Sequence, residues 1–379
     1  MGPTLFVVAG EVSGDLLAAP LIDALRRREP RIRVVGVGGP RLAAAGCELL
    51  HDSTTWGVIG HIDPLLRLGT YLRRLRAVEA DIRRLHPSAL LLVDFPGFNL
   101  RLAERLHGGV PIVYYFPPLV SVRKGNRAAR VAHLGMRLLA TLRREEDAYR
   151  GAGADVVLIG HPIIDLALPR RSPEQARAAF DLPADAPIVG LLPGSRRQEV
   201  RQHLRVMLQA AARVLAEAPE VHFIIPVASE ALRPAIVPAV RASGLPARVV
   251  DEPYDAMAVA TLLVTATGTA TLEAAVLGVP MVAVYRLPWP GMFIARRLVS
   301  VRYAALPNIL AGREIIPELL QERMTPGAVA AEVLSLLRSP ERRDSMRAAL
   351  RAVVNDLGPA GALDRAAGEV LQVLAGGVA

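Results

Sequence analysis

The sequence predicts an α/β protein built from two Rossmann-like parallel-sheet domains that face each other across a cleft. Three observations lead to this prediction. The 379 residues exceed what one hydrophobic core usually serves, short apolar runs alternate with longer amphipathic segments, and the alternation pauses once before it restarts. Such alternation is typical of βαβ units, whose strands pair in parallel and bind ligands at their carboxyl ends.

The pause sets the expected domain boundaries. We predict an N-terminal domain over 1–165, a C-terminal domain over 166–345 and a helical tail over 346–379, with the Pro- and Arg-rich stretch 160–175 as the linker. Periodicity alone assigns the tail to neither domain, and packing back on the N-terminal domain is one alternative.

The N-terminal half contains six candidate strands, each a short apolar run bounded by turn-forming or charged residues. In chain order they are TLFVVAG (4–10), RVVGVGG (33–39), ALLLVDF (89–95), PIVYYF (111–116), RLLATL (137–142) and ADVVLIG (154–160). The amphipathic segments between them predict helices that include 14–28, 65–85 and 98–107.

The C-terminal half repeats the pattern with five candidate strands. They are PIVGLLPG (187–194), HFIIPVA (222–228), ARVVDEP (247–253), ATLLVTATG (260–268) and VPMVAVYRL (279–287). The last stretch, 326–375, is helical in pattern.

Composition excludes several classes of protein. Cys47 is the only cysteine, which rules out an internal disulfide framework and a cysteine metal cluster. No uncharged apolar run reaches the roughly 18–20 residues of a spanning helix, and no signal peptide is evident, so we expect a cytoplasmic protein. The net charge of +9 favours anionic partners. Nucleic acid is the weakest of these, because aromatics make up only 4% and zinc-finger spacing is absent.

Two segments of the C-terminal half predict a place for a diphosphate and a ribose. LLPGSRRQEV (191–200) follows a strand and opens a helix, where Ser195 can cap the helix and Arg196 can meet an anion. In TATGTATLEAAVLGVPMV (265–282), Gly268 and Thr269 again precede a helix, and the carboxylate of Glu273 could accept both hydroxyls of a ribose. An ordinary β–α turn and a helix-dipole partner are the structural alternatives.

A third segment, LPNILAGREIIPELLQ (306–321), sets Asn308 among Pro and Gly residues. Polar residues in this setting could be turn formers, and spacing alone does not decide between the two roles.

The first strand of the chain leads into a turn with an unusual charge. FVVAGEVSGDLLAAPLIDAL (6–25) carries Glu11 and Asp15 where a nucleotide-binding turn would receive phosphate. We expect Glu11, Ser13 and Asp15 to face sugar hydroxyls or to hold another catalytic group. The structural alternative makes Ser13 an N-cap with Asp15 in the first turn, which leaves Glu11 unexplained.

A candidate base follows another buried strand. LLVDFPGFN (91–99) ends with Asp94 at the expected ligand edge, with a structural cap as the alternative role. We place Asn99, from the same segment, on the acceptor side. His161 in IGHPIID (159–165) is a second catalytic candidate, and a satisfied structural histidine is an equal alternative.

Several segments together carry a resemblance to a known family. They are AGEVSGD (9–15), VGVGGPRLAAAGC (35–47), VDFPGFNLRLAERL (93–106), IGHPIID, LLPGSRRQEV, ATGTATLEAAVLGVPMVAVYR (266–286) and RRLVSVRYAALPNILAGREIIPELLQ (296–321). The chain resembles the lipid-A-disaccharide synthases, which are inverting glycosyltransferases of the GT-B type. The combination of AGEVSGD with LPNILAGRE is the most specific part.

The resemblance implies a reaction and a division of roles. A 2,3-diacylglucosamine unit would pass from its UDP form to 2,3-diacylglucosamine 1-phosphate, with Asp94 as the base. Arg196 would hold the diphosphate, supported by Gly268 and Thr269, while Glu273 would bind the ribose. Asn308 would lie near the donor. No metal and no cofactor are implied, because GT-B enzymes neutralise the leaving group with arginine and helix N-termini.

Departures from the family fall in the acceptor-side half. Gly97 replaces a second aspartate, PPLVSVRKGNR (117–127) lacks the family's two tryptophans, and LRREE (142–146) replaces an apolar pair by Arg143 and Arg144. Donor use is therefore the firmer prediction. The alternatives are a paralogue with another lipid acceptor and an isomerase of the UDP-GlcNAc 2-epimerase kind.

The expected partners include a membrane surface besides the UDP-sugar donor and the acylated phosphosugar acceptor. Segments 56–85 and 289–303 combine Trp56 or Trp289 with leucines and arginines, which suits peripheral contact with the inner face of the membrane. An amphipathic helix that covers the sheet is the alternative. A homodimer is left open.

Overall fold

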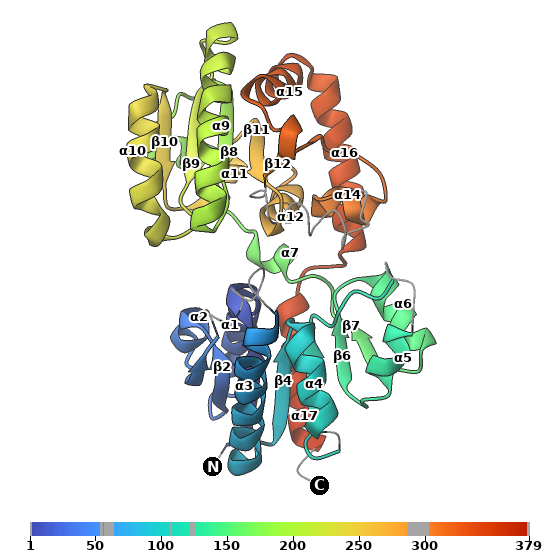
Figure 1. Cartoon of the computed structure of the whole chain (residues 1–379). Helices are drawn as coiled ribbons and strands as arrows, with labels where there is room; N and C mark the ends of the chain where they lie inside the picture. The colour runs from blue at the N-terminus through green and yellow to red at the C-terminus, as the bar shows by residue number, and fades with distance from the viewer. Residues whose placement is uncertain are drawn as a thin grey trace. The chain divides into compact units, whose positions relative to one another are not determined.

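The computed structural model describes residues 2–53, 56, 64–106, 108–121, 126–286 and 303–376. The chain forms two compact units: Met1–Asp165 together with Leu357–Ala379, and Leu166–Asp356 (Figure 1). Each unit has its own parallel sheet with helices on its faces, so the predicted α/β fold with two Rossmann-like domains is confirmed.

Unit 1 is built on a seven-stranded sheet in the order β3-β2-β1-β4-β5-β6-β7, and every described strand pair is parallel. The strands are β1 (Thr4–Ala9), β2 (Arg33–Gly38), β3 (Glu48–Asp52), β4 (Ala89–Val93), β5 (Ile112–Tyr115), β6 (Arg137–Ala140) and β7 (Val156–Leu158). The central strand β4 is buried throughout, as expected when helices cover both faces. The prediction missed β3, an edge strand that begins and ends with a charged residue.

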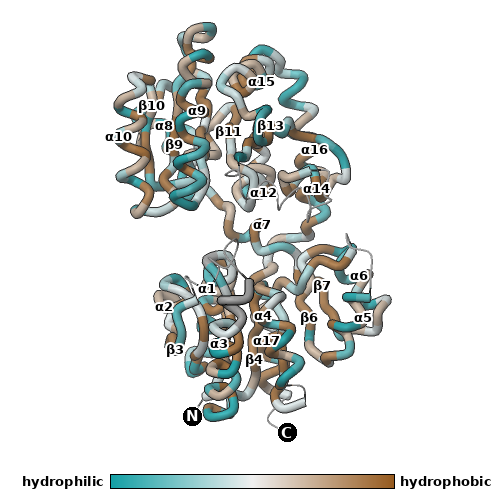
Figure 2. Tube along the Cα trace, viewed as in Figure 1, coloured by the Kyte–Doolittle hydropathy of each residue, from teal (hydrophilic) through white to brown (hydrophobic). Residues whose placement is uncertain are grey.

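Helices cover both faces of this sheet. They are α1 (Glu11–Arg28), α2 (Pro40–Ala44), α3 (Pro64–Leu85), α4 (Pro96–Leu106), α5 (Arg127–Ala132), α6 (Arg143–Gly151), α17 (Ala362–Gly376) and, at the boundary between the units, α7 (Ile163–Leu166). One core contains Ile22 of α1 and Val370 of α17. The other contains Val78 of α3 and Leu102 of α4. The strands between these cores are mostly hydrophobic (Figure 2).

Unit 2 has a six-stranded parallel sheet in the order β10-β9-β8-β11-β12-β13. Its strands are β8 (Ile188–Leu192), β9 (His222–Pro226), β10 (Ala247–Val250), β11 (Leu262–Ala266), β12 (Met281–Tyr285) and β13 (Glu318–Leu320). Its helices are α8 (Pro173–Ala179), α9 (Arg197–Glu217), α10 (Arg233–Ser243), α11 (Pro253–Ala258), α12 (Thr269–Val276), α14 (Leu306–Ala311), α15 (Pro326–Arg338) and α16 (Pro340–Asp356). The prediction missed β13, which has only three residues.

The predicted tail, 346–379, is divided, and only its part from Leu357 onward belongs to unit 1. The chain returns to that unit at Leu357, because α16 is still part of unit 2, so the return comes later than residue 346. α17 packs against α1, and Ala366 and Val370 are fully buried there. Arg137 of β6 also pairs with Glu369 at 2.6 Å, which fastens the tail to the sheet.

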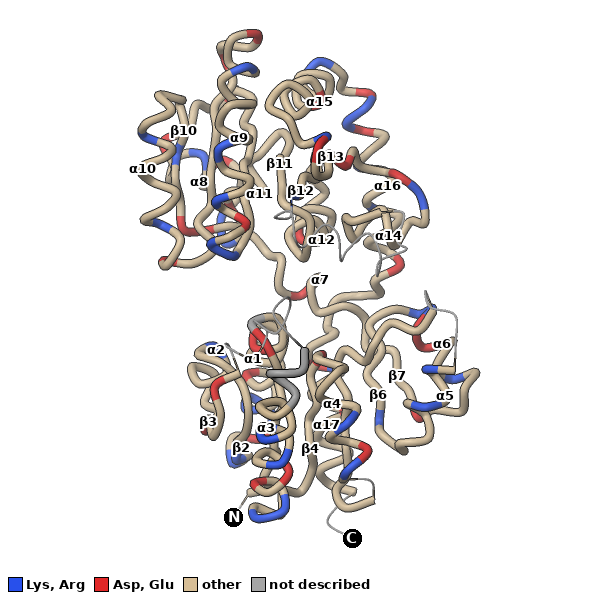
Figure 3. The backbone as a smooth tube through the Cα atoms, viewed as in Figure 1, with Lys and Arg blue, Asp and Glu red and all other residues tan. Residues whose placement is uncertain are grey.

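The segment around α3 behaves as a sheet-covering helix. Trp56 is only 4% exposed, stacks at a tilt on Phe98 and lies under the guanidinium of Arg74, so it is not an exposed anchor. Leu75 and Ile82 of α3 are buried, while four of its arginines, Arg73, Arg76, Arg83 and Arg84, are exposed; Figure 3 shows the basic residues along this helix in blue. The other predicted membrane segment, 289–303, lies outside the described residues except for its last residue. Within the described chain, no helix is long and apolar enough to cross a bilayer.

Candidate active site

Strained backbone gathers at the carboxyl edge of the unit 1 sheet. The neighbouring strands β1, β4 and β5 are each followed by non-glycine residues in the left-handed region: Glu11 (φ 62°), Asp94 (φ 47°) with Phe95 (φ 49°), and Phe116 (φ 58°). Each costs of order 1–3 kcal/mol and persists only where surrounding contacts enforce it. Ligands of parallel sheets bind at this edge, so the strain coincides with the expected site.

Asp94 has the surroundings of a general base. Its side chain is half-buried, and the hydroxyl of Ser13 donates to its Oδ2 at 3.4 Å. Burial raises the pKa of the Asp94 carboxyl, against the backbone N–H of Phe95 and the Ser13 hydroxyl, which lower it. A raised pKa favours proton transfer from an alcohol, and Ser13 leaves most of the carboxylate lone pairs for that alcohol.

Two buried side chains fix the backbone of Asp94. Asn99 Nδ2 donates to the Asp94 carbonyl at 2.7 Å and also reaches the carbonyls of Val93 (3.2 Å) and Val8 (3.4 Å). The hydroxyl of Tyr114, from β5, donates to the same Asp94 carbonyl at 3.0 Å. Asn99 is completely buried, so our placement of it against the acceptor is corrected: it positions Asp94 from behind. Tyr114 was missed, because tyrosine in a buried strand also fits a plain core.

The turn after β1 is a helix start. α1 begins at Glu11 with Gly10 as its N-cap, so Ser13 lies inside the helix and caps nothing. A side chain at Gly10 would place its Cβ 2.1 Å from the ring of Phe95, so glycine is required for this close approach. The structure therefore brings Ser13 to Asp94, as one of our interpretations of the turn expected.

Asp15 has a structural role. It is 2% exposed, and its carboxylate accepts hydrogen bonds from the N–H groups of Gly39 (2.9 Å), Arg41 (3.1 Å) and Leu42 (2.9 Å). These groups are the unpaired donors at the start of α2, so Asp15 caps that helix from another element. Our placement of Asp15 on the acceptor side is corrected, because all its contacts are internal.

We expect Asp15→Asn to lower the free energy of unfolding by about 2 kcal/mol, because the amide replaces an acceptor oxygen by a donor that faces N–H groups. Urea unfolding measures the loss. Asp23→Asn, on the exposed side of the same helix, is the control and should change little. Equal stability of the two variants would contradict the capping role.

His161 is held as a neutral structural residue. Its Nδ1 accepts the N–H of Ile163 at 3.1 Å, its backbone N–H donates to the carbonyl of Leu357 at 2.8 Å, and its ring meets that of Phe116 edge-on. Burial lowers the pKa of His161 to about 4. With Nδ1 occupied and the proton on Nε2, the neutral ring offers no free basic nitrogen, which favours the structural alternative for His161 over a role as a base.

In unit 2, a carboxylate occupies the amides predicted for phosphate. Glu199 Oε2 accepts the N–H groups of Ser195 (2.9 Å) and Arg196 (3.2 Å), and its Oε1 pairs with the Arg196 guanidinium at 3.1 Å. The N-cap of α9 is Arg196, not Ser195, and a Cβ at Gly194 would lie 2.5 Å from Glu199 Oε2. Ser195 and Arg196 are exposed at this edge, and an anion there would have to compete with Glu199 for the Arg196 guanidinium.

A buried histidine, also missed, fixes the strand ends beside this turn. His203 is fully buried, its Nδ1 lies 2.8 Å from the carbonyl of Pro193, and its Nε2 accepts the N–H of Arg286 at 3.1 Å. Burial lowers the pKa of His203, so the ring is neutral and joins the end of β8 to the end of β12.

The ribose candidate lies on the neighbouring strand. β11 is next to β8, and Gly268 and Thr269 are exposed between β11 and α12. Glu273, one turn into α12, is half-buried and accepts the Tyr254 hydroxyl at 3.3 Å. Burial raises the pKa of Glu273, against the hydrogen bond from Tyr254. Arg196, Gly268, Thr269 and Glu273 thus share the carboxyl edge of one sheet.

Asn308 is not available to a donor. It is completely buried, its Nδ2 donates to the carbonyl of Ile316 (2.9 Å) and to Glu318 Oε1 (2.8 Å), and its Oδ1 accepts the N–H groups of Ile315 (2.7 Å) and Ile316 (3.0 Å). All its hydrogen-bonding capacity is used. The assignment of Asn308 to the donor is therefore corrected.

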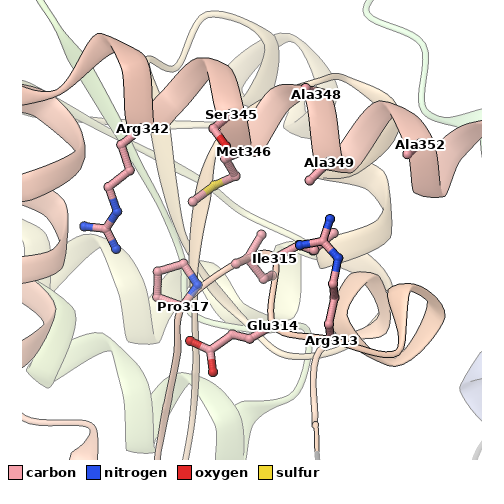
Figure 4. Close-up of a pocket in the computed structure, with 11 residues that line it drawn as sticks. Arg313, Glu314, Ile315, Pro317, Arg342, Ser345, Met346, Ala348, Ala349 and Ala352 are labelled. Carbon is pink, nitrogen blue, oxygen red and sulfur yellow. The ribbon is translucent and has the colours of Figure 1, made fainter.

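A separate cavity of about 560 Å³ lies between the 313–317 turn and α16 (Figure 4). Arg313 and Arg342 line it together with Glu314, and Arg342 is already paired with Glu332 at 2.7 Å. It contains none of the residues predicted to hold the donor.

Comparison with known proteins decides the family. The model of the lipid-A-disaccharide synthetase family matches residues 5–362. The chain belongs to this family. Synthases of the family join UDP-diacylglucosamine to diacylglucosamine 1-phosphate, so the predicted reaction class, a hexosyl transfer in lipid A formation, is confirmed.

Individual relatives align with nearly the whole of this chain. Lipid-A-disaccharide synthases from Anaeromyxobacter dehalogenans (strain 2CP-C), Myxococcus xanthus (strain DK1622) and Geobacter sulfurreducens are 41%, 38% and 36% identical, each over 98% of this chain and 97–98% of the relative. These identities support the synthase and not the epimerase alternative.

Solved structures share the fold at low identity. An S. aureus MnaA–UDP co-structure has a TM-score of 0.64 at 15% identity and covers 99% of this chain and 97% of its own. The calicheamicin glycosyltransferase CalG4 has a TM-score of 0.57 at 19% identity, with 98% of both chains covered. At these identities the likeness concerns the fold, which is the GT-B architecture of glycosyltransferases and epimerases.

Proposed function

We propose that this synthase-family chain divides the transfer between its units, with the acceptor activated by Asp94 of unit 1 and the UDP group held by unit 2. The observation that carries this proposal is the environment of Asp94. The pKa of its carboxyl is raised, and Asn99 and Tyr114 fix its backbone carbonyl. The one side-chain donor to the carboxylate that the described residues show is the Ser13 hydroxyl, at 3.4 Å. A carboxylate of this kind suits a general base for an alcohol.

The transfer is a single displacement with inversion. The acceptor 6-hydroxyl oxygen attacks the anomeric carbon of the donor sugar, and its proton passes to Asp94. The bond from that carbon to the diphosphate oxygen breaks, and UDP leaves with the electron pair. Arg196 and the N-terminus of α12 at Gly268 and Thr269 stabilise the charge that develops on the leaving group.

Donor binding requires Arg196 to exchange partners. Its ion pair with Glu199 is exposed on the arginine side, where such pairs contribute little. A diphosphate, with more charge and a bidentate geometry, can replace Glu199 at small cost. Glu273 then accepts the ribose hydroxyls.

We expect Arg196→Ala to weaken UDP binding by about 1–3 kcal/mol, the range of a charge-assisted hydrogen bond. Isothermal titration with UDP measures the change. Arg197→Ala, the exposed neighbour at the start of α9, removes the same charge and is the control. Similar losses in both variants would contradict a specific role for Arg196.

We also propose peripheral attachment at the inner face of the membrane, where acylated substrates reside. The exposed arginines of α3 and the net charge of +9 support attraction to anionic lipid. Co-sedimentation with vesicles that contain or lack an anionic lipid tests this: binding to neither kind would exclude it.

The function itself is tested by supplying both acylated sugars to the purified chain. We expect release of UDP together with an acylated disaccharide phosphate. UDP-GlcNAc alone, followed by proton NMR, should remain unchanged. Epimer formation without an acceptor would overturn the proposal.

A further inference from the structure

Arg144, at the start of α6, has an unusual guanidinium. Its Nε and Nη2 atoms are buried and have no hydrogen-bond partner among the residues that the structure describes. These two atoms form one edge of the guanidinium, the edge that binds a carboxylate or a phosphate with two parallel hydrogen bonds. Arginine stays charged at all physiological pH values, so an unpaired edge is costly.

Helix geometry explains why the nearby acids do not neutralise Arg144. Side chains one or two positions apart on a helix do not face each other, which excludes Glu145 and Glu146. Glu146 instead pairs through Oε1 with Arg150 at 2.5 Å, one turn along, while its Oε2 is buried without a hydrogen bond to any described residue. Asp147 is on the same face as Arg144, but it is exposed, and no ion pair joins the two residues in the described chain.

Glu145 is committed to the loop that follows β5. Its carboxylate accepts the N–H of Val120 at 2.7 Å and contacts both the N–H and the hydroxyl of Ser121. The Tyr149 hydroxyl donates to the carbonyl of Pro118 at 2.6 Å. These bonds hold residues 118–121 against α6. The carboxylate of Glu145, next to Arg144 in the sequence, is therefore already used and does not neutralise Arg144.

Arg144 and Asp94 lie at the same edge of the unit 1 sheet. α6 begins directly after β6, and Asp94 directly after β4, with β5 between them in the strand order. Two strand spacings separate the positions by roughly 10 Å across the sheet. One phosphosugar, together with the arginine side chain, spans such a distance.

A second cation lies in the same region. Arg127, at the start of α5, is half-buried, has no hydrogen bond or ion pair to any described residue, and acts electrostatically on Tyr114 and Tyr149. Figure 3 shows the basic and acidic residues that α5 and α6 bring together. Glu145 and Glu146 contact other residues, and neither makes a hydrogen bond or ion pair to Arg127 or Arg144 within the described residues.

We propose that Arg144 binds the phosphate of the acceptor sugar while Asp94 takes the proton from its hydroxyl. The proposal rests on the proposed function and adds the residue that selects a phosphorylated acceptor. Because the Nε and Nη2 edge makes no hydrogen bond where it lies, rotation of the side chain toward the phosphate breaks none there. The side chain as a whole is only partly buried, so it is not enclosed on every side.

Arg144→Leu and Arg143→Leu form a matched pair. Both remove one positive charge from the first turn of α6, but the Arg143 side chain is 71% exposed and lies beside Glu146. Each variant and the unaltered protein are assayed with diacylglucosamine 1-phosphate and with diacylglucosamine that lacks the phosphate. UDP affinity and thermal unfolding verify that unit 2 and the fold are intact.

The unaltered protein should prefer the phosphorylated acceptor in kcat/KM. Arg144→Leu should reduce this preference roughly ten- to hundredfold, through a higher KM for the phosphorylated acceptor alone. Arg143→Leu should retain it. A full preference in Arg144→Leu, or an equal loss in both variants, overturns the inference.

The unaltered protein also separates this inference from the proposed function. If it makes no disaccharide from either acceptor, the proposed function fails. If it works and Arg144→Leu discriminates normally, only the phosphate assignment fails. Should Arg144→Leu not fold, Arg144→Gln keeps a polar side chain of similar length without the charge, and the same loss of preference is expected.

Discussion

We expect Asp94→Asn to reduce kcat by roughly 10²–10⁴-fold, the usual contribution of general base catalysis, without a change in UDP affinity. The amide preserves the shape of the side chain and can still accept from Ser13, but it cannot take a proton from the acceptor. The groups that we propose to hold the donor belong to unit 2, a separate compact unit, so UDP binding has no reason to change. Initial rates of UDP release and titration with UDP measure the two properties.

The pH dependence provides an independent check on Asp94. The base must be ionised to act, so activity falls as the pH decreases through its pKa. Burial raises that pKa above the ordinary value for aspartate, which moves the acidic limb of the profile to higher pH. The limb should be missing from the residual activity of Asp94→Asn.

Ser13→Ala is the control for this site. It removes the 3.4 Å hydrogen bond to Asp94 and leaves the base in place, so a modest fall in kcat and a slightly higher pKa are expected. A large loss of UDP affinity in Asp94→Asn, or an unchanged acidic limb, would contradict the assignment.

The strands of both sheets could be predicted because parallel sheets buried on both faces leave continuous apolar runs in the sequence. ALLLV became the fully buried β4, and IVGLL became β8. β3 (ELLHD) and β13 (ELL) lack this signal, since they are short edge strands with acidic residues. β3 is only partly buried, whereas Glu318 and Leu319 of β13 are buried, and that strand is too short to form a recognisable apolar run.

Residue roles were harder to predict, because the partner of a polar side chain lies far along the chain. Asp15 accepts from residues 24 to 27 positions away, and Ser13 reaches Asp94 across 81 positions. Glu199 was overlooked although it lies within the quoted turn, since only the folded geometry shows that it occupies the amides of Ser195 and Arg196. A sequence motif indicates which residues lie near a site. Their hydrogen-bond partners in the folded protein then distinguish the residues that can contact a ligand from those that stabilise the surrounding structure.

Asn308 provides the largest stability effect that we expect from one substitution. Asn308→Ala removes the amide and leaves its buried partners unpaired. The N–H groups of Ile315 and Ile316 lose their acceptor, and Glu318 loses a donor. Glu318 is 7% exposed and also accepts the N–H groups of Ala304 and Ala305, so a weakened carboxylate loosens the start of α14.

The expected loss is roughly 3–5 kcal/mol in the free energy of unfolding, because buried polar and charged groups are left without partners. Urea unfolding followed by circular dichroism measures it. Arg313→Ala, an exposed change in the same LPNILAGRE segment, should stay within about 0.5 kcal/mol of the parent. Once folded, Asn308→Ala should bind UDP with unchanged affinity. A variant that is as stable as the parent but binds UDP more weakly would contradict this structural role. That result would indicate a direct contact between Asn308 and the donor.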